Sequence, residues 1–273
     1  MTSTGHITPV CGTPCWVNRM TRDLRAMQDF YSAVLGWTFG PGSLGSGFSV
    51  ASAHGRPVAG LGEVAPGLPV AGSWTVYFAV TDADVTAARV RERGATVAVG
   101  PVRFGLGRGA VAADRDGAVF GFWEGRALPW SDDRGNAPAF VELRTRDAFD
   151  AAVFYAQIFD WASGEPGGCE VTYAYEHDTV TVRQGKNLMA TLRGGGVEES
   201  PDPRVRPRWN VHFQVDDVEA AIYAACGNGG TATPVTHLPG GGTKSVISDP
   251  EGGLFTVCTR SVLAGPVTTA GPV

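Results

Sequence analysis

Residues 74–80 read WTVYFAV, and residues 209–215 read WNVHFQV, a shift of 135 positions. The same shift relates DRDG at 114–117 to DPEG at 249–252. Closer to the N-terminus the shift is 124, and it relates three groups to their copies: TRD at 21–23 and 145–147, FY at 30–31 and 154–155, and GW at 36–37 to DW at 160–161. Such self-similarity marks a duplicated structural unit. The second copy therefore holds about eleven extra residues, which we expect in the Gly-, Pro- and charge-rich stretch 193–208.

Each copy contains the same order of periodic segments. Apolar alternation and helical spacing predict, in the first copy, strands at 15–21, 48–53, 58–62, 75–80, 96–99, 109–113 and 119–123, with helices over 24–34 and 82–93. Gly36 and Gly94 stand where these helices should end, and Asp82 is a suitable N-cap. The second copy predicts helices at 148–159 and 218–226. The fold class is therefore α+β, with four βαβββ modules, two in each domain.

Composition and turn-rich stretches predict the boundaries of the two domains. We expect a flexible arm over 1–12, a first domain over 13–128, a linker over 129–138, a second domain over 139–261 and a flexible tail over 262–273.

The net charge of −5 argues against nucleic acid as a partner. No apolar run is long enough to span a membrane, and residues 1–10 lack the basic-then-apolar order of a signal peptide, so we predict a cytoplasmic protein. Its five scattered cysteines are expected to be free thiols.

The ordered motifs resemble the vicinal oxygen chelate superfamily, which includes glyoxalase I, extradiol dioxygenases and bleomycin- and fosfomycin-resistance proteins. The resemblance rests on the strand–TRD–helix–FY–GW run, on F-x-V-x-D at 78–82 and 213–217, and on the terminal DPEG, and it covers nearly all of residues 13–260. WVN at 16–18 and the two-domain length resemble, more closely, actinobacterial proteins labelled hydroxylase or glyoxalase-like. The resemblance implies two open barrels, each with a ligand on its concave side, and a role in antibiotic biosynthesis or resistance.

The resemblance also implies where a metal would be bound. Carried over residue by residue, the metal-ligand positions of the family fall on Trp16, Thr75, Gly121, Phe140, Asn210 and Thr256. None of these is a usual ligand for a divalent metal. We therefore expect neither the usual metal site nor another cofactor. Glu142 and His212 stay as weak candidates for a shifted metal site, with Cys258 the nearest third ligand.

Strand alternation separates the residues beneath the helices from those facing the concave side. In the first domain the residues expected to bind ligand are aromatic or uncharged: Trp16, Asn18, Tyr77 and Trp123. In the second domain they are more polar: Phe140, Arg144, Asn210, Gln214, Thr256 and Cys258. Arg19 falls on the helix side and needs either a partner there or a path to solvent.

Glu142 and His212 occupy equivalent points of two related strands, so family geometry places them on opposing walls of one cavity. A carboxylate facing an imidazole is suited to proton transfer, and we take these two as the candidate catalytic residues. Three alternatives stay open: the two groups only satisfy charge, with each other or with Arg144; they move a proton; or they hold a metal.

Two functions of different classes follow. The first, which the sequence favours slightly, is an enzyme acting on a hydrophobic or aromatic small molecule by acid/base chemistry in the second cavity. The second is a binding protein that sequesters a small-molecule toxin, as bleomycin-resistance proteins do. A metal-dependent glyoxalase- or dioxygenase-like enzyme with shifted ligands is a third. Both a monomer and a homodimer fit the sequence, because duplication already supplies pseudo-symmetry.

Overall fold

A computed structural model of the chain describes residues 12–42, 45–65, 73–105, 107–125, 138–165, 167–238 and 241–259. The first copy contains β1 (Pro14–Thr21), α1 (Leu24–Leu35), β2 (Thr38–Pro41), β3 (Phe48–Ala53), β4 (Arg56–Glu63), β5 (Thr75–Val80), α2 (Ala83–Glu92), β6 (Thr96–Phe104), β7 (Gly107–Ala113) and β8 (Val119–Gly125). The second contains β9 (Pro138–Arg144), α3 (Ala148–Phe159), β10 (Glu170–Ala174), η1 (Tyr175–His177), β11 (Thr179–Gln184), β12 (Asn187–Arg193), η2 (Pro203–Val205), β13 (Arg208–Gln214), α4 (Val218–Gly227), β14 (Thr231–Ala232), β15 (Thr236–His237), β16 (Thr243–Ser248) and β17 (Leu254–Cys258).

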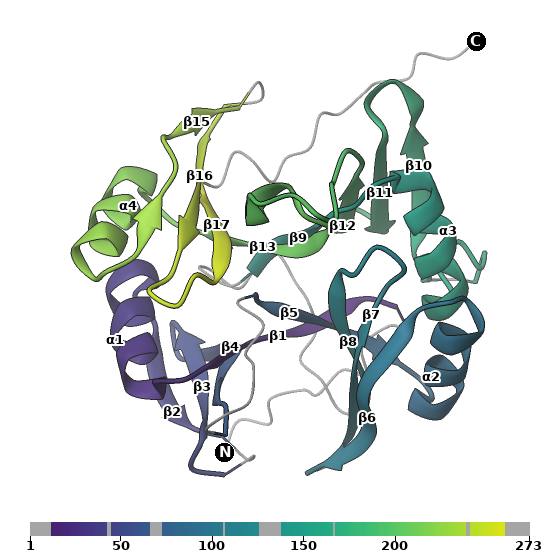
Figure 1. The fold of residues 1–273 in the computed structure, drawn as a ribbon, viewed down its shortest axis with the longest axis horizontal. Helices are drawn as coiled ribbons and strands as arrows, with labels where there is room; N and C mark the ends of the chain where they lie inside the picture. The colour runs from purple at the N-terminus through teal and green to yellow at the C-terminus, as the bar shows by residue number, and fades with distance from the viewer. Residues whose placement is uncertain are drawn as a thin grey trace.

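Each copy forms one mixed sheet. Sheet A has the strand order β2-β3-β4-β1-β5-β8-β7-β6, and sheet B has the order β10-β11-β12-β9-β13-β17-β16-β14, with β15 paired to β16. In both sheets the first strands of two βαβββ modules pair antiparallel at the centre, β1 with β5 and β9 with β13. The sheets bend into arches and stay open (Figure 1). The predicted α+β class with four modules is confirmed.

A repeated aspartate begins every α-helix. Asp23, Asp82, Asp147 and Asp217 are N-caps in extended conformation, and each side chain accepts a hydrogen bond from a backbone N–H of the first turn. The strand prediction missed β2, which is only four residues long, and ended β6 five residues early. Short edge strands carry too few residues for alternation to register.

The insertion in the second copy is split, contrary to the expectation of a single site. Asn18 pairs with Gly60, and its counterpart Glu142 pairs with Thr191, so the shift has already risen from 124 to 131 at β12. Seven extra residues therefore precede β12, and the part that is longer than its counterpart is the connection from α3 to β10, which corresponds to the short connection from α1 to β2. Only four lie between β12 and β13, where the sequence composition had suggested all eleven.

The two sheets pack back to back through their helix-bearing faces. In Figure 1, α1 lies beside α4 on one side of the molecule and α2 lies beside α3 on the other. Aromatic rings fill the space between the copies: Phe213 packs edge-on against Trp37 and Trp74, and Phe78 packs against Phe159 and Trp209. The core thus depends on both copies at once.

Two related clusters of polar side chains are buried in this interface. Tyr31 donates a hydrogen bond to Asp249 (2.9 Å) and accepts one from Trp74 (3.1 Å). In the other half of the interface, Tyr155 donates to Asp114 (2.8 Å) and accepts from Trp209 (3.0 Å). Each aspartate belongs to the opposite copy from its tyrosine. The turns that follow β7 and β16 therefore fasten each copy to the other.

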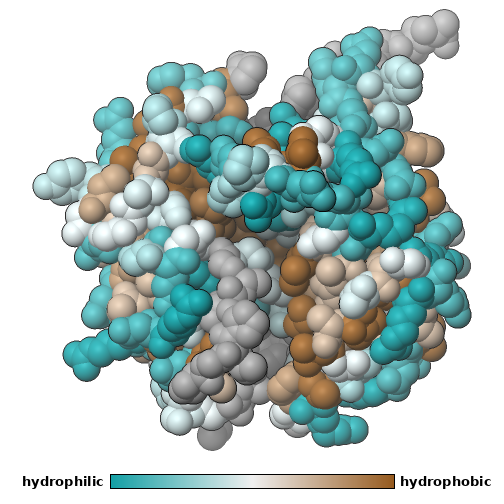
Figure 2. All heavy atoms as spheres, viewed as in Figure 1, coloured by the Kyte–Doolittle hydropathy of each residue, from teal (hydrophilic) through white to brown (hydrophobic). Residues whose placement is uncertain are grey.

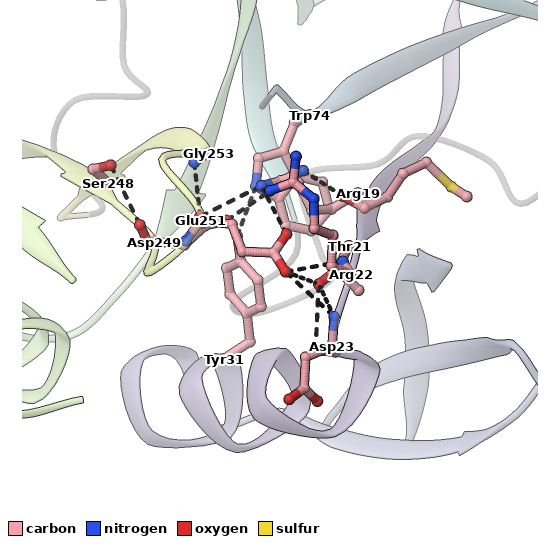
Figure 3. Close-up of polar contacts among 11 residues, drawn as sticks. Arg19, Thr21, Arg22, Asp23, Tyr31, Trp74, Ser248, Asp249, Glu251 and Gly253 are labelled. Atoms are coloured by element: carbon pink, nitrogen blue, oxygen red, sulfur yellow. Dashed lines mark hydrogen bonds and ion pairs between the residues drawn. The ribbon is translucent and has the colours of Figure 1, made fainter. Parts of the chain in front are cut away.

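The two clusters differ in one charge. Arg19 is fully buried, and its Nε lies 3.0 Å from Oδ2 of Asp249, with Glu251 at 3.7 Å from its Nη2 (Figure 3). The prediction that Arg19 lies on the helix side is confirmed, and it has a partner there. Its counterpart near Asp114 is Leu143, which is apolar and equally buried. Burial raises the pKa of Asp114 to about 6.

The outer surface is less uniform than the core. Val99, Val102 and Phe104 of β6 are exposed, and Figure 2 shows apolar surface interspersed with hydrophilic surface on the face that it displays. Four of the cysteines, Cys15, Cys169, Cys226 and Cys258, are free thiols. Among the described residues, no helix combines the length and apolar character needed to cross a membrane. The expected arm, linker and tail lie outside the described residues except for Gly12 and Pro138, and Pro138, expected to end the linker, is the first residue of β9.

Candidate functional site

Burial confirms the predicted division of each central strand into two faces. On the helix side, Val17, Val76, Val141, Val211 and Val257 are fully buried. The candidate residues alternate with these positions and therefore lie on the helix-free faces, which point away from the interface between the sheets. We call these faces face A, on sheet A, and face B, on sheet B.

Face A is a platform of aromatic rings. Trp16 on β1 pairs with Tyr77 on β5, and Trp123 on β8 lies one strand further along, beside Ala79. All three rings are partly exposed. No charged side chain lies between these rings on the three strands, as the sequence predicted. Face A therefore suits a ligand with an uncharged aromatic surface.

Glycines allow these rings to lie flat against the sheet. A Cβ at Gly121 would collide with the Tyr77 ring, and one at Gly107 would collide with the Trp123 ring. Burial, opposed by a hydrogen bond with Asn18, raises the pKa of Tyr77 to about 12. The buried Oδ1 of Asn18 has no hydrogen-bond partner within the described part of the chain.

Face B carries His212 at its centre. The imidazole is 3 % exposed and stacks on Phe140, with ring centroids 4.0 Å apart and planes inclined by 19°. Neither ring nitrogen has a hydrogen-bond partner among the described residues. Burial is the main reason why the pKa of His212 falls to about 4, and the positive charge of Lys244 contributes further. The imidazole is therefore neutral at physiological pH.

Glu142 is a diagonal neighbour of His212 and does not face it across a cavity. Strands β9 and β13 are adjacent, and Glu142 pairs with Asn210 whereas His212 pairs with Phe140. The prediction that Glu142 and His212 lie on opposing walls of one cavity is wrong, because the first strands of the two modules pair with each other at the centre of one sheet. Oε2 of Glu142 lies 3.8 Å from Nε of Arg193, so its ion-pair partner is neither His212 nor Arg144. The Glu142 charge still raises the pKa of His212 against the effect of burial.

The remaining candidates surround this pair. Asn210, Gln214 and Thr256 are buried on the same face, and Thr256 pairs with His212 in the parallel ladder of β13 and β17. Cys258 is fully buried beside Gln214; burial raises the pKa of its thiol to about 12, and the thiol donates to the carbonyl of Phe213. Arg144 lies at the opposite end of β9 from Phe140 and donates to the carbonyl of Gly195 (3.1 Å).

Comparison with known proteins now decides the family. The model of the glyoxalase-like domain matches residues 16–122 and again residues 140–258. The chain belongs to the glyoxalase-like domain family. The two matches coincide with the two sheets, so the duplication seen in the sequence is a duplication of this domain.

Relatives of this glyoxalase-like protein carry different names. It is 31 % identical over 268 residues to the anthracycline biosynthesis protein DauV of Streptomyces sp. strain C5, covering 90 % of this chain and 92 % of that one. It is 29 % identical over 259 residues to CFP32 of Mycobacterium tuberculosis, provisionally named a glyoxylase, covering 90 % and 94 %. The Mn(II)-bound glyoxalase of Novosphingobium aromaticivorans shares the fold, with a TM-score of 0.58 at 18 % identity over 92 % of this chain and 83 % of that chain.

The residues of this glyoxalase-like protein do not fit the divalent metal that such a neighbour binds. The expected ligand positions hold Trp16, Thr75 and Gly121 on sheet A and Phe140, Asn210 and Thr256 on sheet B. Across the described residues, no group of three or more His, Cys, Asp or Glu side chains is placed to hold a metal ion. We therefore derive no step through a metal.

Sequence reasoning missed three cations on face B of this protein. Arg208 pairs with Arg144, Arg193 pairs with Arg144 on its other side, and Lys244 pairs with Cys258, so all three share the face of the candidate residues. Extending the alternation of β13 by one step, from Asn210 back to position 208, would have found the first. The other two depend on strand register, which alternation within one strand does not give.

Two buried groups of this protein should oppose each other in the pH dependence of its stability. The pKa of His212 is lowered from 6.5 to about 4, so its contribution is present above pH 6.5 and is lost as pH falls through about 4. The pKa of Asp114 is raised from 3.8 to about 6, so its contribution is present below pH 3.8 and is lost as pH rises through about 6. Each amounts to about 3 kcal/mol.

Each single substitution should therefore leave only the other group's contribution to the pH dependence of the free energy of unfolding. In His212→Gln, we expect the free energy of unfolding to decrease, relative to the wild type, as the pH rises from 4 to 6, because only Asp114 still titrates. In Asp114→Asn, we expect it to rise over the same interval. Denaturant titrations at pH 4, 5, 6 and 7 measure both. Two variants with the pH profile of the wild type would contradict the assignment.

Proposed function

We propose that this protein is an enzyme that binds a hydrophobic, aromatic small molecule of secondary metabolism on face B and acts on it by proton transfer, with His212 accepting the proton. The observation that carries the proposal is the buried, neutral imidazole, whose two ring nitrogens have no hydrogen-bond partner in the described part of the structure. Burying a polar group without a partner is costly, and such groups concentrate at functional sites. A bound ligand that donates a proton to one nitrogen would satisfy it.

The surroundings of His212 are suited to such a transfer. Phe140 holds the ring in one orientation by stacking, so the nitrogens point in fixed directions. Glu142 favours the imidazolium that forms, because its charge raises the pKa of His212. Asn210, next to Glu142 in the ladder, offers an amide that can hold a carbonyl group of the ligand. A general base of this kind can serve isomerisation or ring closure by taking a proton from the ligand, and hydration or hydrolysis by taking one from water.

The relatives support the class of ligand. DauV and the similar DnrV of Streptomyces peucetius are named for anthracycline biosynthesis, and anthracyclines are multi-ring aromatic compounds. The stacked rings of Phe140 and His212 give the centre of face B an aromatic character that fits such a scaffold. A natural product with fused rings is therefore the ligand we infer.

A binding protein that sequesters its ligand is the second candidate, and face A favours it. The rings over Gly121 and Gly107 and the Oδ1 of Asn18 suit a neutral aromatic ligand. Of the described residues, however, none on this face offers a group for proton transfer near neutral pH. Sequestration requires affinity and no chemistry. The two functions therefore differ in which face is used.

Product analysis separates the two. The purified protein is incubated with a panel of hydroxyanthraquinones and anthracyclines in excess, then denatured, and the small molecules are identified by mass spectrometry. We expect at least one compound to be transformed in more than one equivalent per protein. A ligand that is bound and recovered intact in one equivalent or less would support sequestration and overturn the enzymatic proposal.

A further inference from the structure

Face B holds more positive charge than the fold requires. Arg144, Arg193 and Arg208 project from three adjacent strands of sheet B beside Glu142, and Lys244 projects from a fourth strand of the same face. The corresponding positions of sheet A are Met20, Gly62, Ser73 and Gly109, all uncharged. Since the two sheets have the same topology, the cations are not needed to build the fold.

Two of these cations stand side by side. Arg144 and Arg208 are directly opposite in the antiparallel ladder of β9 and β13. Like charges at such positions destabilise a sheet. Burial, and then the charge of Arg144, lower the pKa of Arg208 to about 10, while Glu142 and Asp202 act against this. Glu142 lies nearest to Arg193, at 3.8 Å, and does not form a short ion pair with either guanidinium.

The loop between β12 and β13 holds both guanidinium groups in place by its carbonyls. Arg144 donates to Gly195, and Arg208 donates to Pro203 and to Arg206. This loop, green in the upper centre of Figure 1, lies in a hydrophilic region of the surface (Figure 2). Even so, the buried Nε atoms of Arg144 and Arg208 have no hydrogen-bond partner within the residues that the structure describes. The pair is thus oriented by neutral acceptors, with donor capacity left over.

From this arrangement we infer that Arg144 and Arg208 bind a carboxylate of the ligand. The planar fork of an arginine matches a carboxylate in a bidentate fashion, and two adjacent arginines can share one anion. The anion would offset the repulsion between the two charges and satisfy the free Nε–H groups. This inference rests on the proposed function, because it specifies the ligand of the same face.

The distance along β13 sets the length of that ligand. Arg208 and His212 are four residues apart on one strand and point to the same side, which separates their Cα atoms by roughly 13 Å. The Arg208 side chain reaches back over part of this distance. The ligand is therefore an aromatic acid whose carboxylate lies on the order of 10 Å from the proton that His212 accepts, which two or three fused rings span.

A matched pair of probes tests the inference. Anthraquinone-2-carboxylate and anthraquinone-2-carboxamide have the same rings and differ in charge. We expect the intact protein to bind the acid at least tenfold more tightly than the amide in equilibrium dialysis at pH 7.5, with a preference that weakens as salt rises from 50 to 500 mM. Arg144→Gln and Arg208→Gln should each remove most of this preference and leave the affinity for the amide unchanged.

Arg204→Gln is the matched control, because Arg204 lies in the same loop but is exposed and paired with Asp202. It should keep the preference for the acid. Equal binding of acid and amide by the wild type would overturn the carboxylate site and leave the proposed function standing, whereas binding of neither probe would overturn both. A loss in Arg204→Gln as large as that in Arg208→Gln would also overturn the site, because net charge alone would then explain it.

Discussion

Asp249→Asn is expected to lower the free energy of unfolding by about 3–5 kcal/mol, the largest stability effect of any single change in the interface between the two copies. The substitution keeps the size of the side chain and removes its charge. Arg19 is fully buried and would lose its main counter-ion, whereas Glu251 lies further away, at 3.7 Å. A buried guanidinium without a paired carboxylate carries a large desolvation penalty.

Several hydrogen bonds depend on the same carboxylate. Oδ1 of Asp249 accepts from the backbone N–H groups of Glu251 (3.0 Å) and Gly253 (2.7 Å), and Oδ2 accepts from Tyr31 (2.9 Å). The turn so formed places Glu251 against Thr21, the last residue of β1 in the other copy (2.8 Å; Figure 3). An amide reproduces at most part of this set, because its nitrogen donates where the carboxylate accepts. Loss of the charge therefore also loosens the contact between the copies.

The duplicated position supplies the control. Asp114 accepts the equivalent bonds from Tyr155, Asp116 and Ala118, but Leu143 stands where the other cluster has Arg19. Asp114→Asn leaves no cation unpaired and removes a carboxylate whose pKa burial has raised to about 6. We expect it to change the free energy of unfolding at pH 7 by about 1 kcal/mol or less. Denaturant titrations of both variants at pH 7 measure the difference, and equal losses would contradict the role given to Arg19.

The fold was accessible from the sequence because duplication states the same pattern twice. The motifs at 74–80 and 209–215 fix the central strands, and the residues that they share, Val76 with Val211 and Phe78 with Phe213, are the fully buried ones. Alternation then placed Tyr77 and His212 correctly on the face of each sheet that lies opposite to these buried residues. Most of the extra length lies in the connection between α3 and β10, and composition did not find it, because a loop tolerates extra residues without changing the periodic pattern.

The site was only partly accessible. Alternation placed Glu142 and His212 on one face, but their relation as diagonal neighbours depends on how β9 pairs with β13. The pairing also brings Arg208 beside Arg144. The lowered pKa of His212 depends first on burial, which follows from tertiary packing. Register and desolvation are properties of the folded chain, and no local pattern encodes either.

His212→Gln is expected to reduce turnover of the compound found by product analysis by about 10²–10⁴-fold, the range that a positioned general base contributes. Glutamine keeps a polar side chain of similar length but does not accept a proton at neutral pH. With the pKa of His212 lowered to about 4, kcat/KM of the wild type should stay level from neutral pH down to about pH 5 and fall as the pH approaches 4. An ordinary histidine base would lose activity below pH 6.5 instead.

Glu142→Gln separates proton transfer from simple charge balance. Because Glu142 raises the pKa of His212, its removal should move the acid limb of the kcat/KM profile to lower pH, with a smaller loss of turnover than in His212→Gln. Circular dichroism and the melting temperature at pH 7 verify that both variants are folded. If folded His212→Gln kept more than a tenth of the wild-type turnover, the imidazole would not be the proton acceptor. If Glu142→Gln left the acid limb in place, the carboxylate would serve only as the partner of Arg193.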